Sequence, residues 1–182
     1  MLKPHWYVLR ATYGREKKAY EYIVAHGGTA FYPTVTTVKV VNGKKKKVEE
    51  SLLPNLFFVF GTIEDVQKLV KDKVNLSYIR FYCCNNATDN KRNVPLIVPE
   101  SQMKSFQIIC AAKNSNVLTV PNDVTKFHSG QLVRIKEGVF AGVEGRVARY
   151  HGQQRVAVII DGLLTIATAY VPSAFLEVVE FG

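Results

Sequence analysis

The sequence predicts an α+β protein in two parts, an N-terminal α/β sandwich with an antiparallel sheet and a C-terminal small SH3-like β-barrel. Two observations support this prediction. The spacing of apolar residues changes along the 182-residue chain, from a mixture of strand and helix periods to short β-rich stretches alone. The charge changes as well, because residues 1–112 hold 17 Lys and Arg against 9 Asp and Glu, whereas residues 128–182 hold 5 of each.

Strands and helices alternate along the first part. Val, Thr and aromatic residues mark the strands, apolar residues three and four apart mark the helices, and Asn-Gly is a strong hairpin signal. This pattern describes helices packed on one face of a sheet. The expected elements are a strand at 6–12, a helix at 13–26, a hairpin with its turn at Asn42-Gly43, a strand at 56–61, a helix at 63–73, a strand at 76–82, a loop at 85–93 and a helix that begins at Pro99.

The strand at 56–61 is apolar on both of its sides, with Leu56, Phe58 and Phe60 on one of them. Two or three helices cover only one face of a sheet. The other face, with Trp6 on a neighbouring strand, is therefore a candidate partner-binding patch. The alternative is that the hairpin or the second part of the chain covers it.

The second part follows a segment without periodicity. Residues 111–126 are polar and contain a proline, which indicates a linker. Residues 127–182 hold five short β-rich stretches with glycines at the corners, as in a small SH3-like barrel. The predicted domains are therefore residues 1–110, a linker at 111–126 and residues 127–182.

The chemistry-bearing residues form no enzymatic or metal-binding pattern. Cys83, Cys84 and Cys110 lack the paired spacing of zinc sites, and the histidines are scattered, so we expect reduced thiols, no metal and no cofactor. Nucleophile motifs, convergent carboxylates and phosphate-binding glycine loops are missing too, which predicts that the chain is not an enzyme. The longest apolar run, 52–60, is broken by Pro54 and cannot cross a bilayer, so we expect a cytoplasmic protein.

Both parts resemble the NusG family. Gly130 to Val147, with its glycine-containing turn and closing Gly145, is similar to the KOW motif, and the N-terminal segments follow the order of the NusG N-terminal domain, so that the resemblance covers almost the whole chain. Pro54-Asn55-Leu56, residues 97–103 and residues 163–172 resemble the specialised paralogues RfaH and the UpxY-like regulators of polysaccharide operons. The matching N-terminal segments are Trp6-Tyr7-Val8-Leu9, Glu16 to Ala19, Phe31-Tyr32-Pro33-Thr34 and Leu53 to Val59.

This resemblance implies a transcription elongation or antitermination factor that binds RNA polymerase and promotes processive transcription. Specific long operons, such as those for polysaccharide biosynthesis, are the expected targets. Members of the family grip the clamp helices of the largest polymerase subunit through an apolar patch on the N-terminal domain. The matching positions here are Trp6, Leu53, Pro54, Leu56 and Phe58.

Nucleic acid is the second implied partner, either non-template DNA or nascent RNA. In RfaH the first helix touches non-template DNA, and cations with an aromatic on one helix face suit a single strand. The lysine-rich hairpin end is a further candidate for phosphate contacts. In both places the alternative is an ordinary solvated surface. The candidate residues are Thr12, Arg15, Lys18 and Tyr22 on the helix and Lys44, Lys45, Lys46 and Lys47 on the hairpin.

The second part departs from the family in one loop. NusG barrels bind a ribosomal protein or the Rho terminator through a Phe-Gly-Arg loop, and Leu163, Leu164 and Thr165 stand at those positions, so we expect this contact to be altered or absent. Asp65, Val66 and Gln67 likewise stand where RfaH has the His-Thr-Thr element that contacts the second large polymerase subunit. The competing interpretation of the whole chain is a KOW-containing RNA-binding or ribosome-associated protein, which predicts a basic barrel.

The barrel of RfaH refolds into a helical hairpin that masks the polymerase-binding patch. Here the equivalent segment carries five interior glycines, each of which costs a helix about 1 kcal/mol relative to Ala. We therefore expect this segment to be a β-barrel in the free protein and the N-terminal patch to be open or only loosely covered. The glycines are Gly138, Gly142, Gly145, Gly152 and Gly162.

Overall fold

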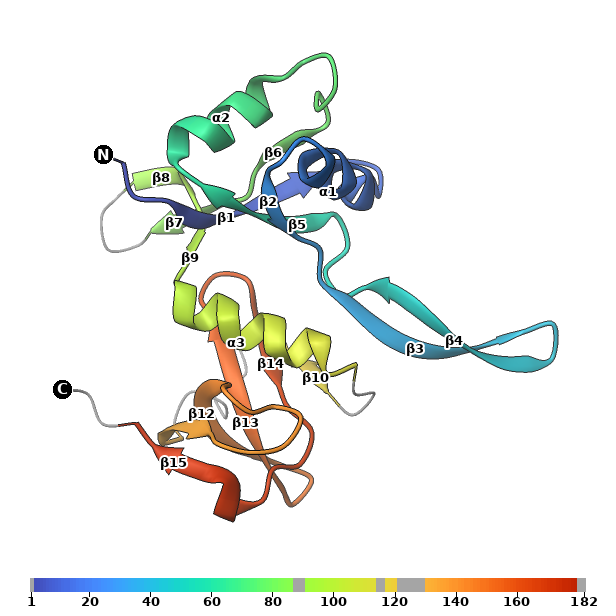
Figure 1. Ribbon diagram of the computed structural model, residues 1–182, viewed down its shortest axis with the longest axis vertical. Helices are drawn as coiled ribbons and strands as arrows, with labels where there is room; N and C mark the ends of the chain where they lie inside the picture. Colours follow the sequence, from blue (N-terminus) through green and yellow to red (C-terminus); the bar gives the residue numbers. More distant parts are fainter. Residues whose placement is uncertain (1, 87–90, 114–116, 121–129, 180–182) are drawn as a thin grey trace. The chain divides into compact units, whose positions relative to one another are not determined.

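The computed structural model divides the chain into two compact units, which Figure 1 shows coloured along the sequence. The first unit comprises Met1–Thr34 and Ser51–Glu100, and the second comprises Val35–Glu50 and Ser101–Gly182. The structure describes residues 2–86, 91–113, 117–120 and 130–179.

An antiparallel sheet forms the first unit, with two helices packed on it. The strand order is β2-β5-β1-β6, and β9 also pairs with β1. The central pair, β1 and β5, joins segments about fifty residues apart, with Leu9 opposite Phe57. The elements are β1 (His5–Ala11), α1 (Glu16–Ala25), β2 (Thr29–Phe31), β5 (Leu56–Gly61), α2 (Ile63–Lys71), β6 (Ile79–Phe81) and β9 (Ile97–Val98).

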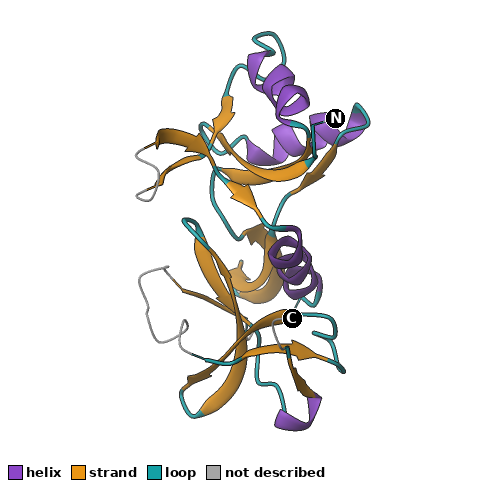
Figure 2. Cartoon of the chain, turned by 90° about the vertical axis from the view of Figure 1, so that its left-hand side faces the viewer, coloured by secondary structure: helices purple, strands orange, loops and turns teal. Residues whose placement is uncertain are grey.

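Both helices cover the same face of this sheet, as Figure 2 shows. Ala19 and Ile23 of α1 and Val66 of α2 pack with Leu9 and Phe57 in one fully buried cluster. Helix α2 begins where the hydroxyl of its N-cap residue, Thr62, accepts a hydrogen bond from the backbone N–H of Asp65 at 3.2 Å. The predicted packing of helices on one sheet face is confirmed.

Two hairpins extend the chain beyond this sheet. Strands β3 (Thr34–Val41) and β4 (Lys44–Ser51) meet at Asn42 and Gly43, whose φ values of 51° and 73° are those of the tight hairpin turn that Asn-Gly favours. The second hairpin, β7 (Cys83–Asn86) and β8 (Lys91–Pro95), lies where the sequence predicts a loop at 85–93. That prediction is wrong for the described residues, because pairing between the two strands overrides their poor individual β propensity.

The second unit contains a six-stranded antiparallel sheet in the order β10-β14-β13-β12-β11-β15. Its strands curve around a core that includes Ala148, Ala157 and Ala167 (Figure 2). Together with the first unit, this β domain confirms the predicted α+β fold. The segment with the five glycines, which we expected to be β and not helical, consists of strands and turns. The elements are α3 (Glu100–Ala111), β10 (Leu118–Val120), β11 (Leu132–Ile135), β12 (Glu144–Tyr150), β13 (Gln153–Ile160), β14 (Leu164–Ala167) and β15 (Leu176–Val178).

Helix α3 belongs to the second unit, apart from its first residue. The hydroxyl of Ser105 accepts a hydrogen bond at 3.0 Å from the backbone N–H of Glu144, at the start of β12. Strand β10, which pairs with β14, falls within the range predicted as a linker, and residues 114–116 and 121–129 lie outside the described residues. The predicted domain boundaries at 110 and 127 stay predictions.

Candidate functional site

The sheet face opposite the helices carries an apolar surface around Trp6. The antiparallel register places Trp6 of β1 opposite Phe60 of β5, and their ring centroids are 5.3 Å apart. Both rings are only half-buried and line a hollow of about 230 Å³. We call the half-buried and exposed apolar residues of this region the Trp6 surface, which consists of Trp6, Leu53, Pro54, Leu56 and Phe60.

A tight turn before β5 presents part of this surface. The backbone N–H of Leu56 donates to the carbonyl of Leu53 at 3.0 Å, which leaves Pro54 exposed at the tip of the turn. Phe58 differs from its predicted neighbours, since it is fully buried, with its ring 6.1 Å from that of Phe31. In this conformation it offers no surface to a partner. The polymerase-binding role of the five predicted residues stays a prediction.

The loop before α1 gathers the first two candidate nucleic-acid residues. The guanidinium of Arg15 donates through Nε to the carbonyl of Thr12 at 3.2 Å and through Nη2 to the Thr12 hydroxyl at 3.3 Å. It also lies over the ring of Tyr78, 4.1 Å from the centroid. These contacts hold the cation in a fixed position at the entrance to the helix.

The other two candidates lie on α1 itself. Lys18 is exposed, whereas Tyr22 is half-buried and stacks on His26, with 4.0 Å between the ring centroids. We expected Arg15 to share a helix face with them. Arg15 instead occupies the N-cap position before the helix and is half-buried, because its side chain folds back on Tyr78.

Sequence reasoning missed three residues in and around the loop before α1. Tyr13 has 91% of its surface exposed and a φ of 58°, in the left-handed region. Asn55, on the turn before β5, accepts a hydrogen bond from the backbone N–H of Gly14 at 3.0 Å, and Tyr78 supplies the ring beneath Arg15. Gly14 and Asn55 are of residue types that adopt positive φ readily, and these were the available signals.

The end of the hairpin concentrates positive charge. Lys44, Lys45, Lys46 and Lys47 are all exposed, and none of them pairs with an acidic side chain among the described residues. Their role in nucleic-acid binding stays a prediction.

The acidic residues at the base of the hairpin are engaged, in contrast to the lysines at its end. Glu50 pairs with Lys39 and accepts a hydrogen bond from the Thr37 hydroxyl at 2.9 Å. These contacts, led by the hydrogen bond from Lys39, lower the pKa of the Glu50 carboxyl. Glu49 pairs with Lys113 at 2.7 Å. The cations near the turn are thus left available, whereas those near the base are neutralised locally.

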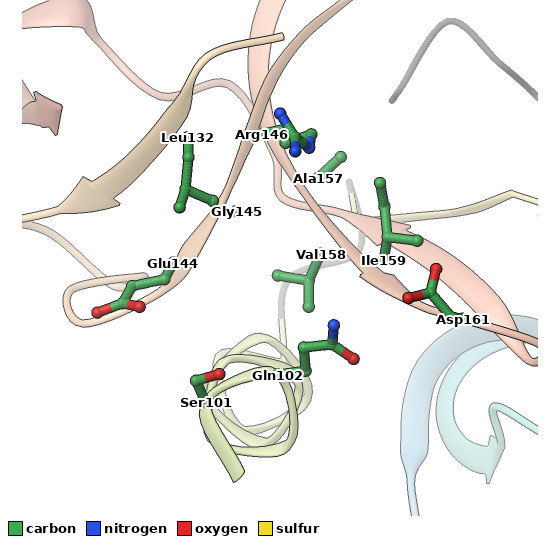
Figure 3. Close-up of a pocket in the computed structure, with 10 residues that line it drawn as sticks. All are labelled: Ser101, Gln102, Leu132, Glu144, Gly145, Arg146, Ala157, Val158, Ile159 and Asp161. Carbon is green, nitrogen blue, oxygen red and sulfur yellow. The ribbon is translucent and has the colours of Figure 1, made fainter. Parts of the chain in front are cut away.

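The second unit contains a hollow of about 410 Å³. In Figure 3 the side chains of Ser101 and Gln102 on α3 face strands β12 and β13 across it. The Oε1 atom of Gln102 is buried without a hydrogen-bond partner among the described residues. Gly145 is required here, because a Cβ atom on it would lie 2.4 Å from the carbonyl oxygen of Ala157. The hollow carries no strongly convergent set of charges, and we assign it no ligand.

The loop at the family's Phe-Gly-Arg position is a tight turn in this chain. Gly162 has a φ of 75°, and the backbone N–H of Leu163 donates to the carbonyl of Ile160 at 3.0 Å. Leu164 and Thr165 are buried in β14. Only Leu163 of the three aligned residues is partly exposed, and the expected alteration of this contact stays a prediction.

The remaining titratable groups were compared within the part of the chain that the structure describes. Among the described residues, no cluster of His, Cys, Asp or Glu is arranged to hold a metal ion. No described helix is long and apolar enough to span a membrane. Burial raises the pKa of the Cys110 thiol to about 12, so that at neutral pH it remains protonated and unreactive.

Known proteins share this sequence pattern. Residues 4–107 match the family described as "Transcription termination factor nusG". Over 176 residues, 90% of each chain, the sequence is 30% identical to the "Transcription termination/antitermination protein NusG" of Pasteurella multocida (strain Pm70). A solved structure described as "Domain interaction in Thermotoga maritima NusG" aligns over 98% of both chains at 19% identity and a TM-score of 0.42, a superposition too loose to carry an argument.

The chain has an α/β sheet domain followed by an antiparallel β domain, and the family match covers most of the sheet domain. These findings define a transcription factor of the termination and antitermination class. The chain belongs to the NusG family. The family resemblance predicted from sequence is thereby confirmed, whereas the specialisation toward RfaH and the UpxY-like regulators stays a prediction.

Proposed function

We propose that this protein is a transcription elongation and antitermination factor that binds RNA polymerase through the Trp6 surface and promotes processive transcription. The observation that supports this most is the half-buried Trp6–Phe60 pair, whose rings lie 5.3 Å apart on the sheet face opposite α1 and α2. Aromatic side chains beside a shallow hollow are common anchors of protein interfaces. The clamp helices of the largest polymerase subunit are the expected partner.

The mechanism is binding without covalent chemistry. A factor that binds the closed form of the polymerase clamp more tightly than the open form shifts the equilibrium toward the closed form and disfavours pausing. The basic first part, with a net charge of +8 over residues 1–112, would hold nearby nucleic acid at the same time. Long operons gain most from such a factor, and polysaccharide operons are the targets that the RfaH and UpxY resemblance favours.

The β domain argues against the competing RNA-binding or ribosome-associated function. Residues 128–182 hold as many acidic as basic side chains, so this part lacks the positive field with which proteins usually attract RNA. Copurification separates the two functions directly. Polymerase subunits in the eluate support our proposal, and ribosomal subunits without polymerase contradict it.

A binding experiment with purified host RNA polymerase tests the Trp6 surface. Trp6→Ala and Leu56→Asp in the full chain are each expected to weaken binding at least about tenfold, because interface anchors carry most of the binding energy. Val74→Ala, at a position 88% exposed in the same unit, is the matched control and should bind normally. Circular dichroism verifies that each variant is folded, and a folded Trp6→Ala variant with unchanged affinity contradicts the proposal.

A further inference from the structure

Tyr13 holds its side chain almost entirely in solvent. With 91% of its surface exposed, the ring has little packing contact with the rest of the first unit. Tyrosine rings are large and usually at least partly buried, because their apolar area is favourable to remove from water. The stability of the fold therefore does not account for a tyrosine at this position.

The backbone at Tyr13 is also in an unfavourable conformation. Its φ is 58° and that of the following Gly14 is 64°, so two successive residues occupy the left-handed region. A bulky side chain is a true outlier there, and such residues persist where the surrounding structure fixes them and where function requires them. Glycine or asparagine would adopt this backbone more easily, but neither carries a ring.

Asn55 fixes the loop from the neighbouring turn. Its side-chain Oδ1 accepts a hydrogen bond from the backbone N–H of Gly14 at 3.0 Å, and its carbonyl oxygen accepts one from the backbone N–H of Ala11 at 2.8 Å. The two bonds fall on either side of Tyr13. They hold the backbone of the loop in place before any partner arrives.

A positive charge lies beside this ring. The guanidinium of Arg15 lies 5.6 Å from the centroid of Tyr13, and Lys18 is exposed one turn further along the chain. An exposed aromatic face next to cations provides the two contacts that an unpaired nucleotide needs, stacking for the base and attraction for the phosphate. A protein segment would need apolar neighbours around the ring, and Gly14, the next residue in the chain, is exposed and offers none.

We infer that Tyr13 is a stacking residue for an unpaired nucleobase and that Asn55 is the positioning residue that presents it. A base within a duplex is covered on both faces by its neighbours, so the ring selects a single strand over a double one. The inference extends the proposed function by naming the chemistry with which the first unit takes hold of a strand. Non-template DNA and nascent RNA both supply such a base.

Free oligonucleotides test the inference without polymerase. Binding of the full chain to single-stranded DNA and to RNA of the same sequence is measured at low salt, with each strand also prepared with abasic sites. Tyr13→Gly, which suits the backbone but lacks the ring, is expected to weaken binding roughly five-fold to 150-fold, the range of one base–aromatic stacking contact. Tyr13→Phe should bind within about two-fold of the wild type, since it keeps the stacking face.

A matched control, and a cycle that combines the protein variant with the abasic strand, complete this experiment. Tyr170→Ala removes a ring that is 56% exposed in the second unit and should leave strand binding unchanged. Abasic strands should weaken the wild type about as much as Tyr13→Gly does, and should weaken Tyr13→Gly no further. The inference is wrong if the wild type and Tyr13→Gly bind intact strands equally, or if abasic sites weaken both proteins to the same extent.

Elongation complexes distinguish the two sources of the base. Abasic sites are placed either in the exposed non-template strand or in the emerging RNA. The base comes from the strand whose abasic sites make the wild type and Tyr13→Gly bind the complex equally. If Tyr13→Gly also binds more weakly than the wild type to polymerase that carries no nucleic acid, the ring makes a protein contact and the inference is overturned. If the wild type binds strands through Tyr13 but does not bind polymerase, the inference stands and the proposed function falls.

Discussion

The Oδ1 atom of Asn55 accepts a hydrogen bond from the backbone N–H of Gly14 at 3.0 Å, across 41 residues of sequence. This contact joins the turn that carries Leu53 and Pro54 to the loop that carries Tyr13. The proposed polymerase surface and the proposed nucleic-acid surface are therefore parts of one hydrogen-bonded framework. The Asn55 side chain adds to the pairing of β1 with β5, which already joins these two segments.

Substitution of Asn55 tests this framework through stability. Asn55→Ala is expected to lower the free energy of unfolding by about 1–2 kcal/mol, because alanine is strained at a φ of 67° and the bond to Gly14 is lost. Asn55→Gly should cost less, since glycine tolerates that φ. Urea unfolding followed by the fluorescence of Trp6, the only tryptophan, reports on the first unit. Equal losses for both variants would show that backbone strain is unimportant here.

Replacing Tyr13 should reveal a trade between stability and binding. Tyr13→Gly is expected to raise the free energy of unfolding by up to about 1 kcal/mol, because relief of left-handed strain, about 1–2 kcal/mol, exceeds the entropy that glycine adds to the unfolded chain. Tyr13→Ala keeps the strain and should not be stabilised. The same urea experiment measures both variants, and a Tyr13→Gly protein less stable than Tyr13→Ala would contradict our account of the strain.

The salt dependence of binding tests the role of Lys18. Lys18→Glu is expected to weaken association with an elongation complex that exposes non-template DNA and to reduce the slope of log K against log salt, because fewer counterions are released. Lys73→Glu changes the net charge equally at another exposed position of the same unit and is the control. Identical slopes for the two variants would show that only net charge matters. Arg15 is unsuitable for this test, since its reversal also removes the contact with Tyr78.

The thiols are expected to react at very different rates. Cys83 is exposed, whereas burial raises the pKa of Cys110 from an ordinary 9.0 to about 12. At pH 8 a thiol reagent should modify Cys83 quickly and Cys110 only slowly, and Cys110→Ser should remove a slow phase without altering the fast one. A fast phase that disappears in Cys110→Ser would contradict the burial of this side chain.

The same shift in pKa makes stability depend on alkaline pH. The folded protein keeps the Cys110 proton up to about pH 12, whereas the unfolded chain releases it near 9.0. The stability contributed by this group is therefore full below pH 9 and is lost as the pH rises from 9 toward 12. Cys110→Ser should show a flatter decline over that range in urea unfolding.

Local patterns in the sequence were sufficient for much of the fold. The continuous apolar run at 56–61 predicted β5, and Asn42-Gly43 predicted the hairpin turn, because both signals depend on neighbours in the chain. The hairpin of β7 and β8 was missed because its stability comes from pairing between strands and not from β-branched residues.

The candidate surfaces were only partly predictable for a related reason. The strand period placed Trp6 and Phe60 on one face, but it could not show that Phe58, on the same side of β5, would be fully buried. Helical spacing grouped Arg15 with Lys18, but the positive φ values at residues 13 and 14 keep the helix from beginning before Glu16, so Arg15 stays at the N-cap. The contact between Asn55 and Gly14 is non-local, and no local pattern reports it.

The hydrogen bond from Glu144 to Ser105 has a consequence for how such proteins exchange parts during evolution. Recombination between relatives at the polar segment after residue 110 would separate the hydroxyl on α3 from the strand whose N–H it accepts. A hybrid made there combines a helix and a β domain that were never selected together. We expect viable hybrids to carry residues 101–182 as one inherited block, with the crossover before α3.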